Sequence, residues 1–316
     1  MNFRILAAAC SIAIAGPLHA ADEKVTPYQL PGTSDRIIKS ASGAEYRIMV
    51  SVPEGKAPAG GHPVTYLLDG DDLFPLVTSL LRLQAGTGKA AKHNGITPGI
   101  VVGIGYPDAS RRDLDYTPQS PAGPPETYRD GRPYPARPGG GADGFFKFIQ
   151  EELKPLIEKE HSIDTSRQTL MGNGYGGLFA LHVLFTSPAS FQTYVAASPS
   201  VWWNNGYILT EENAFTKSLS GKDLSAKLVL TVGDMEQSLS RVEISWPDAD
   251  EREEHRLKVT RRRMVDNVRE MAWRLEALAP EGLETDFRVF PGESHKSVIP
   301  LSLNHALPHI FPPSGK

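Results

Sequence analysis

The sequence predicts an α/β fold with a mostly parallel central sheet flanked by helices. Short, continuous apolar runs, typical of strands buried on both faces, recur at residues 62–69, 99–105 and 191–197. Segments with apolar residues at helical spacing lie between such runs, as at residues 73–83. Regular alternation of strand and helix indicates parallel strands joined by crossover helices.

The other elements follow the same order. Residues 36–40 and 44–52 alternate apolar and polar side chains around Ser42-Gly43, which predicts an antiparallel hairpin at the sheet edge. Residues 106–142 form a proline- and glycine-rich insertion that we expect to be functional or disordered. Further helices are expected at 145–157 and 177–185, as one long helix from 248 to 278, and after residue 295, where Pro308 should end or kink it; strands are expected at 226–232 and 285–290.

The first twenty residues have the layout of a secretory signal peptide. Arg4 precedes an apolar run that ends at Gly16-Pro17, and small residues surround Ala20, after which we expect cleavage. The alternative, a lipoprotein acylated at Cys10, has only a very short apolar stretch upstream. Cys10 is the only cysteine, so a cleaved chain has no disulfide and no thiolate nucleophile. We expect an exported protein in which residues 21–316 form one domain, without a membrane span.

Composition argues against nucleic acid as a partner. The formal net charge of -4 and the pI near 6.2 lack the basic character of nucleic-acid-binding domains. We expect no cofactor and no metal site. The spacing of His305 and His309 is only a weak metal-binding pattern, because Pro308 interrupts it.

The most informative stretch, residues 168–181, is typical of a strand, a glycine-rich turn and the start of a helix. α/β-Hydrolases hold their nucleophile in such a turn, at the centre of a G-x-S-x-G elbow. Gly174 occupies that central position and has no nucleophilic atom. The same glycines also satisfy the dinucleotide fingerprint G-x-G-x-x-G, but the acidic residue needed about twenty positions later is absent between Gly172 and Glu211. We therefore favour the α/β-hydrolase fold.

That fold places an acid after a late strand and a histidine after the last one. His295 follows the strand ending at Phe290, while Glu236 and Asp234 both follow the strand ending at residue 232. We prefer Glu236, because a few loop residues are needed to bring the acid beneath the histidine, and Asp234 remains the alternative. The oxyanion hole should combine the N–H of Tyr175 with that of Asp71 or Gly70.

Several segments together resemble one branch of these enzymes. They are residues 66–70, 103–106, 111–118, 176–181 and 197–204. In combination they resemble the esterase D-like α/β-hydrolases, and within that branch the periplasmic ferric-siderophore esterases of the enterobactin and salmochelin type. The resemblance implies a periplasmic protein that hydrolyses the ester backbone of a catecholate siderophore. Members read G-H-S-Y-G-G at the elbow, where this chain has Asn173 and Gly174.

The resemblance also implies a large anionic ligand. Arg111 and Arg112 follow a strand near the carboxyl edge of the sheet and would offset the ligand's charge, and Trp202 and Trp203 would form an aromatic wall. Because Gly174 replaces the serine, we expect hydrolysis to be weak or absent. The alternative is a pseudoenzyme that binds the siderophore or another small ester without cleaving it.

Overall fold

The computed structural model describes residues 25–85, 95–219 and 224–312. The predicted signal peptide, including Cys10, lies outside these residues. The chain divides into two compact units, Met1–Pro31 and Gly32–Lys316. The described part of the first, residues 25–31, contains no helix or strand. Within the described ranges, no helix is long and apolar enough to cross a membrane.

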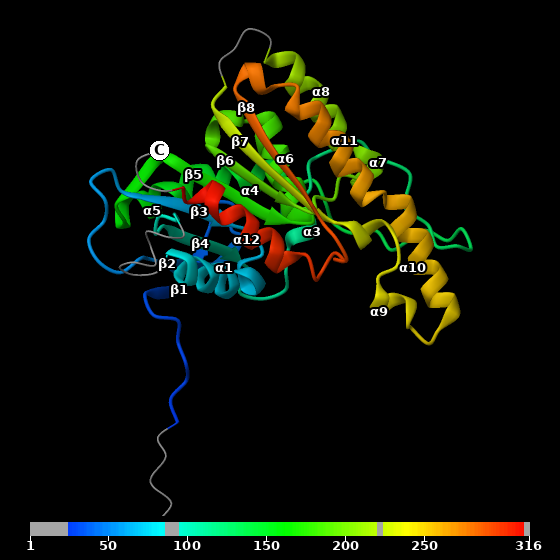
Figure 1. Ribbon diagram of the computed structural model, residues 1–316, viewed down its shortest axis with the longest axis horizontal. Helices are drawn as coiled ribbons and strands as arrows, with labels where there is room; N and C mark the ends of the chain where they lie inside the picture. The colour runs from blue at the N-terminus through cyan, green and yellow to red at the C-terminus, as the bar shows by residue number, and fades with distance from the viewer. Residues whose placement is uncertain (1–24, 86–94, 220–223, 313–316) are drawn as a thin grey trace, which may run out of the picture. The chain divides into compact units, whose positions relative to one another are not determined.

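The second unit is built on one sheet, which in the described residues has eight strands in the order β1-β2-β4-β3-β5-β6-β7-β8 (Figure 1). β2 is antiparallel to both of its neighbours, and every pair from β4 to β8 is parallel. The predicted fold class, including the antiparallel N-terminal hairpin, is confirmed. The strands are β1 (Thr33–Lys39), β2 (Glu45–Ser51), β3 (His62–Leu67), β4 (Ile100–Gly105), β5 (Ile163–Asn173), β6 (Thr193–Ala197), β7 (Ala226–Gly233) and β8 (Leu283–Phe290).

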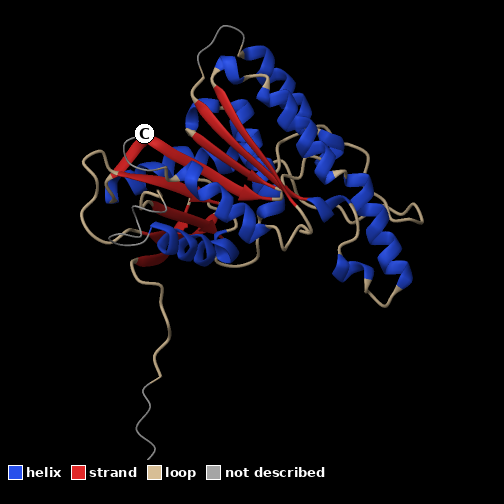
Figure 2. Cartoon of the chain, in the orientation of Figure 1, coloured by secondary structure: helices blue, strands red, loops and turns tan. Residues whose placement is uncertain are grey.

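Helices cover both faces of the sheet (Figure 2). One face packs against α1 (Gly70–Ala85) and α12 (Ile299–Ile310) in a core that includes Leu67, Val195 and Leu307. The other face packs against α4 (Ala142–Phe148), α5 (Lys154–Glu160), α6 (Tyr175–Thr186), α8 (Ile208–Ser218) and α11 (Met264–Glu276). α6 is almost entirely buried, since ten of its twelve residues are inaccessible to solvent. Continuous apolar sequence in α6 therefore reflects burial on all sides.

Four helix predictions differ in part from the structure. α1 begins at Gly70, three residues before the segment 73–83 that has helical spacing in the sequence. The long helix expected from 248 to 278 is two helices, α10 (Ala249–Arg262) and α11, because Arg263 has a left-handed backbone (φ 45°). The helix predicted at 145–157 contains a π-helical segment, Ile149–Leu153, between α4 and α5. α12 continues through Pro308 to Ile310, so this proline does not end the helix.

The insertion contains little regular structure beyond α3 (Arg112–Asp115) and packs its middle part against α10. Arg262 donates to the Glu126 carboxylate at 2.9 and 2.6 Å, and the Tyr134 hydroxyl donates to Glu254 at 2.7 Å. α10 has no buried residue. We call the contact between residues 126–134 and α10 the cap joint. It is made of hydrogen bonds, ion pairs and ring contacts, with little apolar burial.

Candidate functional site

The carboxyl ends of the parallel strands bring the candidate residues to one edge of the sheet. Gly174 follows β5, Ser198 follows β6, Glu236 lies directly after β7 in the short helix Asp234–Gln237, and His295 follows β8. Ligands of open α/β sheets bind at this edge.

The turn at Gly174 has the strained backbone of an elbow. Its angles are φ 61° and ψ −113°, a region that residues with a side chain rarely adopt. The Gly174 N–H donates to the carbonyl of Ala197 at 3.0 Å, and its carbonyl accepts from the N–H groups of Leu178 and Ser200 at 3.0 and 3.1 Å. A Cβ on Gly172 would lie 2.3 Å from the backbone carbon of Gly176, so the chain approaches itself too closely there for any other residue. The surrounding backbone therefore holds the turn in this conformation.

The acid and the histidine form a hydrogen-bonded pair. His295 Nδ1 lies 2.6 Å from Glu236 Oε2. The other oxygen, Oε1, accepts from the hydroxyl of Ser198 at 2.6 Å and from the N–H of Gly233 at 2.7 Å. Glu236 is only 4% exposed, so these donors replace the water that a buried carboxylate loses. Asp234 instead accepts from the N–H of Gly292. The structure thus brings Glu236, and not Asp234, to His295.

The free ring nitrogen of His295 faces the turn. Nε2 lies 3.3 Å from the position that a Cβ on residue 174 would occupy. A hydroxyl on that Cβ would be within hydrogen-bond reach of the imidazole, which is the geometry by which a histidine accepts a proton from a serine. With glycine at this position, the reacting atom itself is not supplied by the chain.

The N–H groups proposed for the oxyanion hole lie in the first turns of two helices. Tyr175 is the first residue of α6, and Gly70 and Asp71 are the first two of α1. N–H groups in a first turn have no acceptor within their own helix, so they can donate to an anion. The carboxylate of Asp71 is itself engaged, because it accepts from the N–H of Tyr106 at 2.7 Å and from Arg47 at 3.0 Å.

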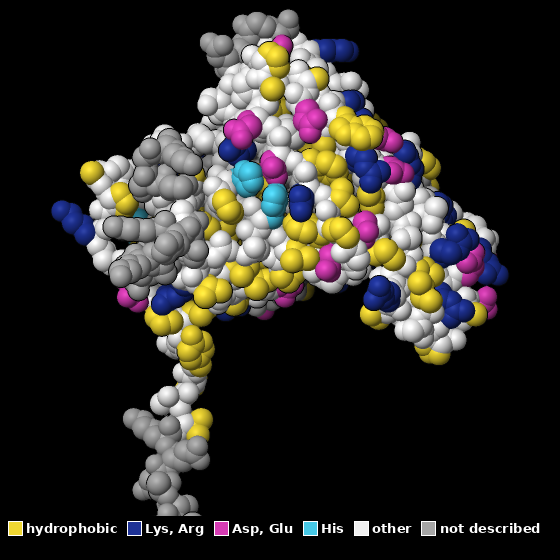
Figure 3. Space-filling view, in the orientation of Figure 1, with side chains coloured by type: hydrophobic (Ala, Val, Ile, Leu, Met, Phe, Trp, Pro, Cys, Tyr) yellow, Lys and Arg dark blue, Asp and Glu magenta, His cyan; other side chains and the backbone are white. Residues whose placement is uncertain are grey.

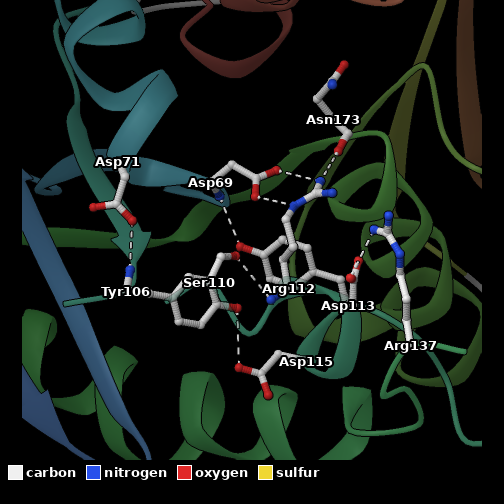
Figure 4. A network of polar contacts seen from close by, with 10 residues as sticks. Asp69, Asp71, Tyr106, Ser110, Arg112, Asp113, Asp115, Arg137 and Asn173 are labelled. Carbon is white, nitrogen blue, oxygen red and sulfur yellow. Dashed lines mark hydrogen bonds and ion pairs between the residues drawn. The ribbon is translucent and has the colours of Figure 1, made fainter. Parts of the chain in front are cut away.

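Arg112 lies beside the elbow (Figure 4). Its guanidinium donates to both oxygens of Asp69, at 2.9 and 3.1 Å, and to the carbonyl of Asn173 at 3.4 Å. Its Nη2 lies 3.9 Å from the Cβ position of residue 174. Burial disfavours the charged form, but the hydrogen bonds and charge of Asp69 outweigh it and raise the pKa of Arg112. A permanent cation therefore stands next to the elbow.

A cavity of about 700 Å³ opens next to the elbow. Its charged lining is mixed, with four aspartates against two cations and His295. Arg112 pairs with Asp69 and Arg47 pairs with Asp71, which leaves a small acidic excess. The lining residues are Asp69, Asp71, Asp72, Leu73, Tyr106, Asp108, Ser110, Arg112, Asn173, His295, Lys296 and Ile299.

The remaining predicted binding residues lie outside the lining of this cavity. Arg111 pairs with the buried Asp115 at 3.1 Å. Trp203 is half-buried and packs against the core. The ring of Trp202 lies 6.1 Å from the ring of Tyr175 and 3.4 Å from the guanidinium carbon of Arg262. Trp202 therefore belongs to a second surface beside the elbow.

This second surface, the basic–aromatic patch, consists of Tyr175, Trp202, Arg137, Lys258 and Arg262. Burial lowers the pKa of Lys258, and the positive charges of Arg262 and Arg137 lower it further, while Glu126 and Glu254 act in the opposite direction. Lys258 is therefore repelled by both arginines, although Arg262 pairs with Glu126 and Arg137 pairs with Asp113. Burial raises the pKa of the Tyr175 hydroxyl; the charges of Arg262 and Arg137 lower it, and those of Asp113 and Glu126 raise it. An anion bound at this patch would relieve the repulsion.

Sequence reasoning missed several of these residues. Ser198 comes directly after a buried strand, and this position could have identified it as a neighbour of the acid. Asp69 likewise lies two residues after β3, at the edge of the sheet where Arg112 lies. Nothing in the sequence joins α10 to the elbow, so Lys258 and Arg262 could be found only in the folded chain.

An elbow after a central strand, with an acid and a histidine after the last two strands, defines an α/β-hydrolase. Residues 40–309 match the esterase family described as "Putative esterase". The chain is 37% identical over 294 residues to the ferri-bacillibactin esterase BesA of Bacillus subtilis, covering 91% of this chain and 92% of that protein. It is 34% identical over 310 residues to the siderophore triacetylfusarinine C esterase of Aspergillus fumigatus, covering 92% and 96%. The siderophore hydrolase EstA from Aspergillus nidulans has a similar structure, with a TM-score of 0.78, 33% identity, and coverage of 93% and 98%. The chain therefore belongs to the esterase family, and its relatives include siderophore esterases.

Proposed function

We propose that this chain binds an anionic siderophore ester at the elbow and hydrolyses it slowly. The observation that carries the proposal is the Glu236–His295 pair, whose free nitrogen lies 3.3 Å from the Cβ position of residue 174. The pair has the geometry of a proton relay, and only the nucleophilic atom is missing from the chain.

Slow hydrolysis requires water as the nucleophile. A water molecule between His295 Nε2 and the ester carbonyl would lose its proton to the imidazole, and the first-turn N–H groups of α6 and α1 would stabilise the oxyanion. In a serine protease, the residual acceleration after loss of a triad member is about 10³ to 10⁴ over water. We expect this chain to accelerate ester hydrolysis by a factor of that order, which is far below the acceleration by an esterase with an elbow serine.

The ligand's charge follows from the two surfaces beside the elbow. The basic–aromatic patch suits an anionic, aromatic ligand, because guanidinium groups both neutralise charge and stack on rings. The adjoining cavity has a small acidic excess and suits a less charged part of the ligand. We therefore propose that a siderophore places its anionic groups over Trp202 and Arg262 and its ester at Gly174. To identify the siderophore, ferric and iron-free forms of candidate siderophores are titrated into the protein, and quenching of its tryptophan fluorescence is measured.

Binding without hydrolysis is the second candidate, and Gly174 favours it. The two are separated in one tube: quenching of tryptophan fluorescence with no hydrolysis product indicates a binding protein, and slow product formation that is lost in His295→Gln indicates an esterase.

The decisive variant is Gly174→Ser, assayed with p-nitrophenyl esters and a ferric siderophore. If the relay is intact, turnover rises by orders of magnitude and a fluorophosphonate labels residue 174. Gly174→Ala is the matched control, because it adds the same Cβ without a hydroxyl. A folded, ligand-binding Gly174→Ser protein with no more activity than Gly174→Ala would refute the relay.

We also propose that the chain is exported to the periplasm after cleavage behind Ala20. The proposal rests on the secretory layout of residues 1–20. N-terminal sequencing of the protein recovered from a periplasmic extract tests it, and a mature protein that still begins at Met1 would refute it.

A further inference from the structure

Three metal-ligating side chains meet on the face of the sheet covered by α12. Asp286 lies in β8, and His305 and His309 lie one turn apart on α12. Their ligand atoms all lie within 4.8 Å of one another. Figure 3 shows histidine side chains gathered beside acidic ones on the surface over α12 and β8. Because α12 continues through Pro308, the two histidines stay on one face of the helix, which the sequence alone did not indicate.

We propose that Asp286, His305 and His309 bind one divalent first-row transition metal ion, with Zn²⁺ as the best match. Two imidazole nitrogens and one carboxylate oxygen are ligands that zinc takes at three of its four positions. An all-oxygen site would favour Mg²⁺ or Ca²⁺, and a thiolate site would favour softer ions. The donor set therefore selects the class of metal.

The distances suit this ion after small movements. Zinc bonds of 2.0 to 2.2 Å place the donors of a tetrahedral site about 3.3 Å apart. Asp286 Oδ1 lies 2.6 Å from His305 Nε2 and 3.8 Å from His309 Nε2. The ion would replace the direct hydrogen bond between Asp286 and His305. The side chains of Asp286, His305 and His309 are 35%, 27% and 22% exposed, so water can reach the fourth coordination position of the ion.

The surrounding charge permits a dication. The charged neighbours that act on His309 are Asp286, Glu284 and Lys227. Lys227 pairs with Glu284 at 2.9 Å, so its charge is largely offset. The carboxylate of Asp286 is left to face the ion, as in other sites where a carboxylate and imidazoles share a metal.

The site joins two elements that the chain connects only through the loop carrying His295. In the described residues β8 is one of the two edge strands of the sheet, and α12 reaches it through His305 and His309. Residues 291–298 run between the two elements. An ion bound to both elements would stabilise this part of the fold, as any ligand bound only by the native state does. None of the three residues lines the cavity at the elbow, so the proposed metal site does not depend on the proposed esterase function.

The test uses the full chain after treatment with EDTA. Titration with ZnCl₂ should give one saturable site per chain and a rise in Tm of several degrees. His309→Gln should weaken Zn²⁺ binding at least about tenfold, the loss typical even for removing an outer partner of a metal ligand. His255→Gln is the matched control, because His255 pairs with the carboxylate of Glu243 at 2.9 Å, but among the described residues no third candidate ligand joins this pair.

Co²⁺ bound to the unaltered chain keeps the test decisive if His309→Gln does not fold. Paramagnetic broadening of imidazole signals should be strongest for His305 and His309. Broadening centred on His295 instead, no saturable binding, or unchanged affinity in a folded His309→Gln protein would each overturn the proposal.

Discussion

Replacing Gly174 with alanine should destabilise the protein, because the elbow backbone is strained for any residue with a Cβ. With φ 61° and ψ −113°, the position lies where a side chain costs about 1–3 kcal/mol. Gly→Ala also restricts the unfolded chain, which returns about 0.4–1 kcal/mol. The difference is a net loss of about 0–2.6 kcal/mol, with a midpoint near 1.3 kcal/mol. The 3.3 Å approach of His295 Nε2 to the new Cβ adds to this loss.

The assay is reversible urea unfolding, with Gly144→Ala as control. Gly144 lies in α4, where an added Cβ meets nothing within 4 Å and φ is not positive. Alanine there should stabilise the protein by about 0.5–1 kcal/mol, because glycine is a poor helix former. The two substitutions should therefore act in opposite directions. A Gly174→Ala protein as stable as the parent would refute the strained elbow. Gly174→Ser should likewise melt below the parent.

Three further predictions concern the relay, the patch and a buried histidine. In the Gly174→Ser background, Glu236→Gln should lower kcat by about 10⁴-fold with little change in ligand affinity, as for the equivalent change in a serine protease. A fall in kcat of less than tenfold would show that Glu236 does not take part in the relay. Lys258→Gln should weaken binding of an anionic siderophore and reduce its salt dependence without destabilising the free protein, because it removes a repelled cation. Arg256→Gln, on the same helix but paired with Glu253, should leave binding unchanged. Burial opposes protonation of His182, but the hydrogen bonds and charges of Glu211 and Asp143 outweigh it and raise its pKa. The charged imidazole therefore stabilises the fold fully below about pH 6.5 and loses this effect as pH rises through the raised pKa. Free energies of unfolding of the parent and His182→Gln, compared across pH, should converge above that pKa, and a constant difference would contradict the assignment.

Much of the fold was predictable because its signals are local. Buried parallel strands are continuous apolar runs, and the elbow is a glycine pattern between a strand and a helix. Arg263 shows the limit of such reasoning: the charged sequence of α10 continues into the apolar spacing of α11 without a glycine or proline between them, yet Arg263 adopts a left-handed conformation.

Some residues of the candidate site were likewise predictable from the sequence, and others were not. Its relay residues follow successive strands, so their order along the chain locates them. The partners of Arg111 and Arg112 depend on side-chain packing: neighbouring arginines point to different carboxylates, and only Arg112 reaches the elbow. Arg111 and Arg112 carry the same charge and are adjacent in the sequence, so no local sequence pattern predicts which of them reaches the elbow.

The cap joint has a consequence for how a ligand leaves. α10 buries no apolar residue, so its attachment to residues 126–134 depends on charged groups such as Arg262 and Glu126, whose side chains are 24% and 35% exposed. Attractions between such charged groups weaken as the ionic strength rises. The apolar packing on the two faces of the sheet does not depend on these attractions. Regions held mainly by exposed polar contacts open at low free-energy cost while the rest of the fold stays intact. Hydrogen exchange in α10 should therefore accelerate with added salt while β5 and α6 remain protected. Under the proposed function, a ligand held over Trp202 and Arg262 would then leave faster at high ionic strength.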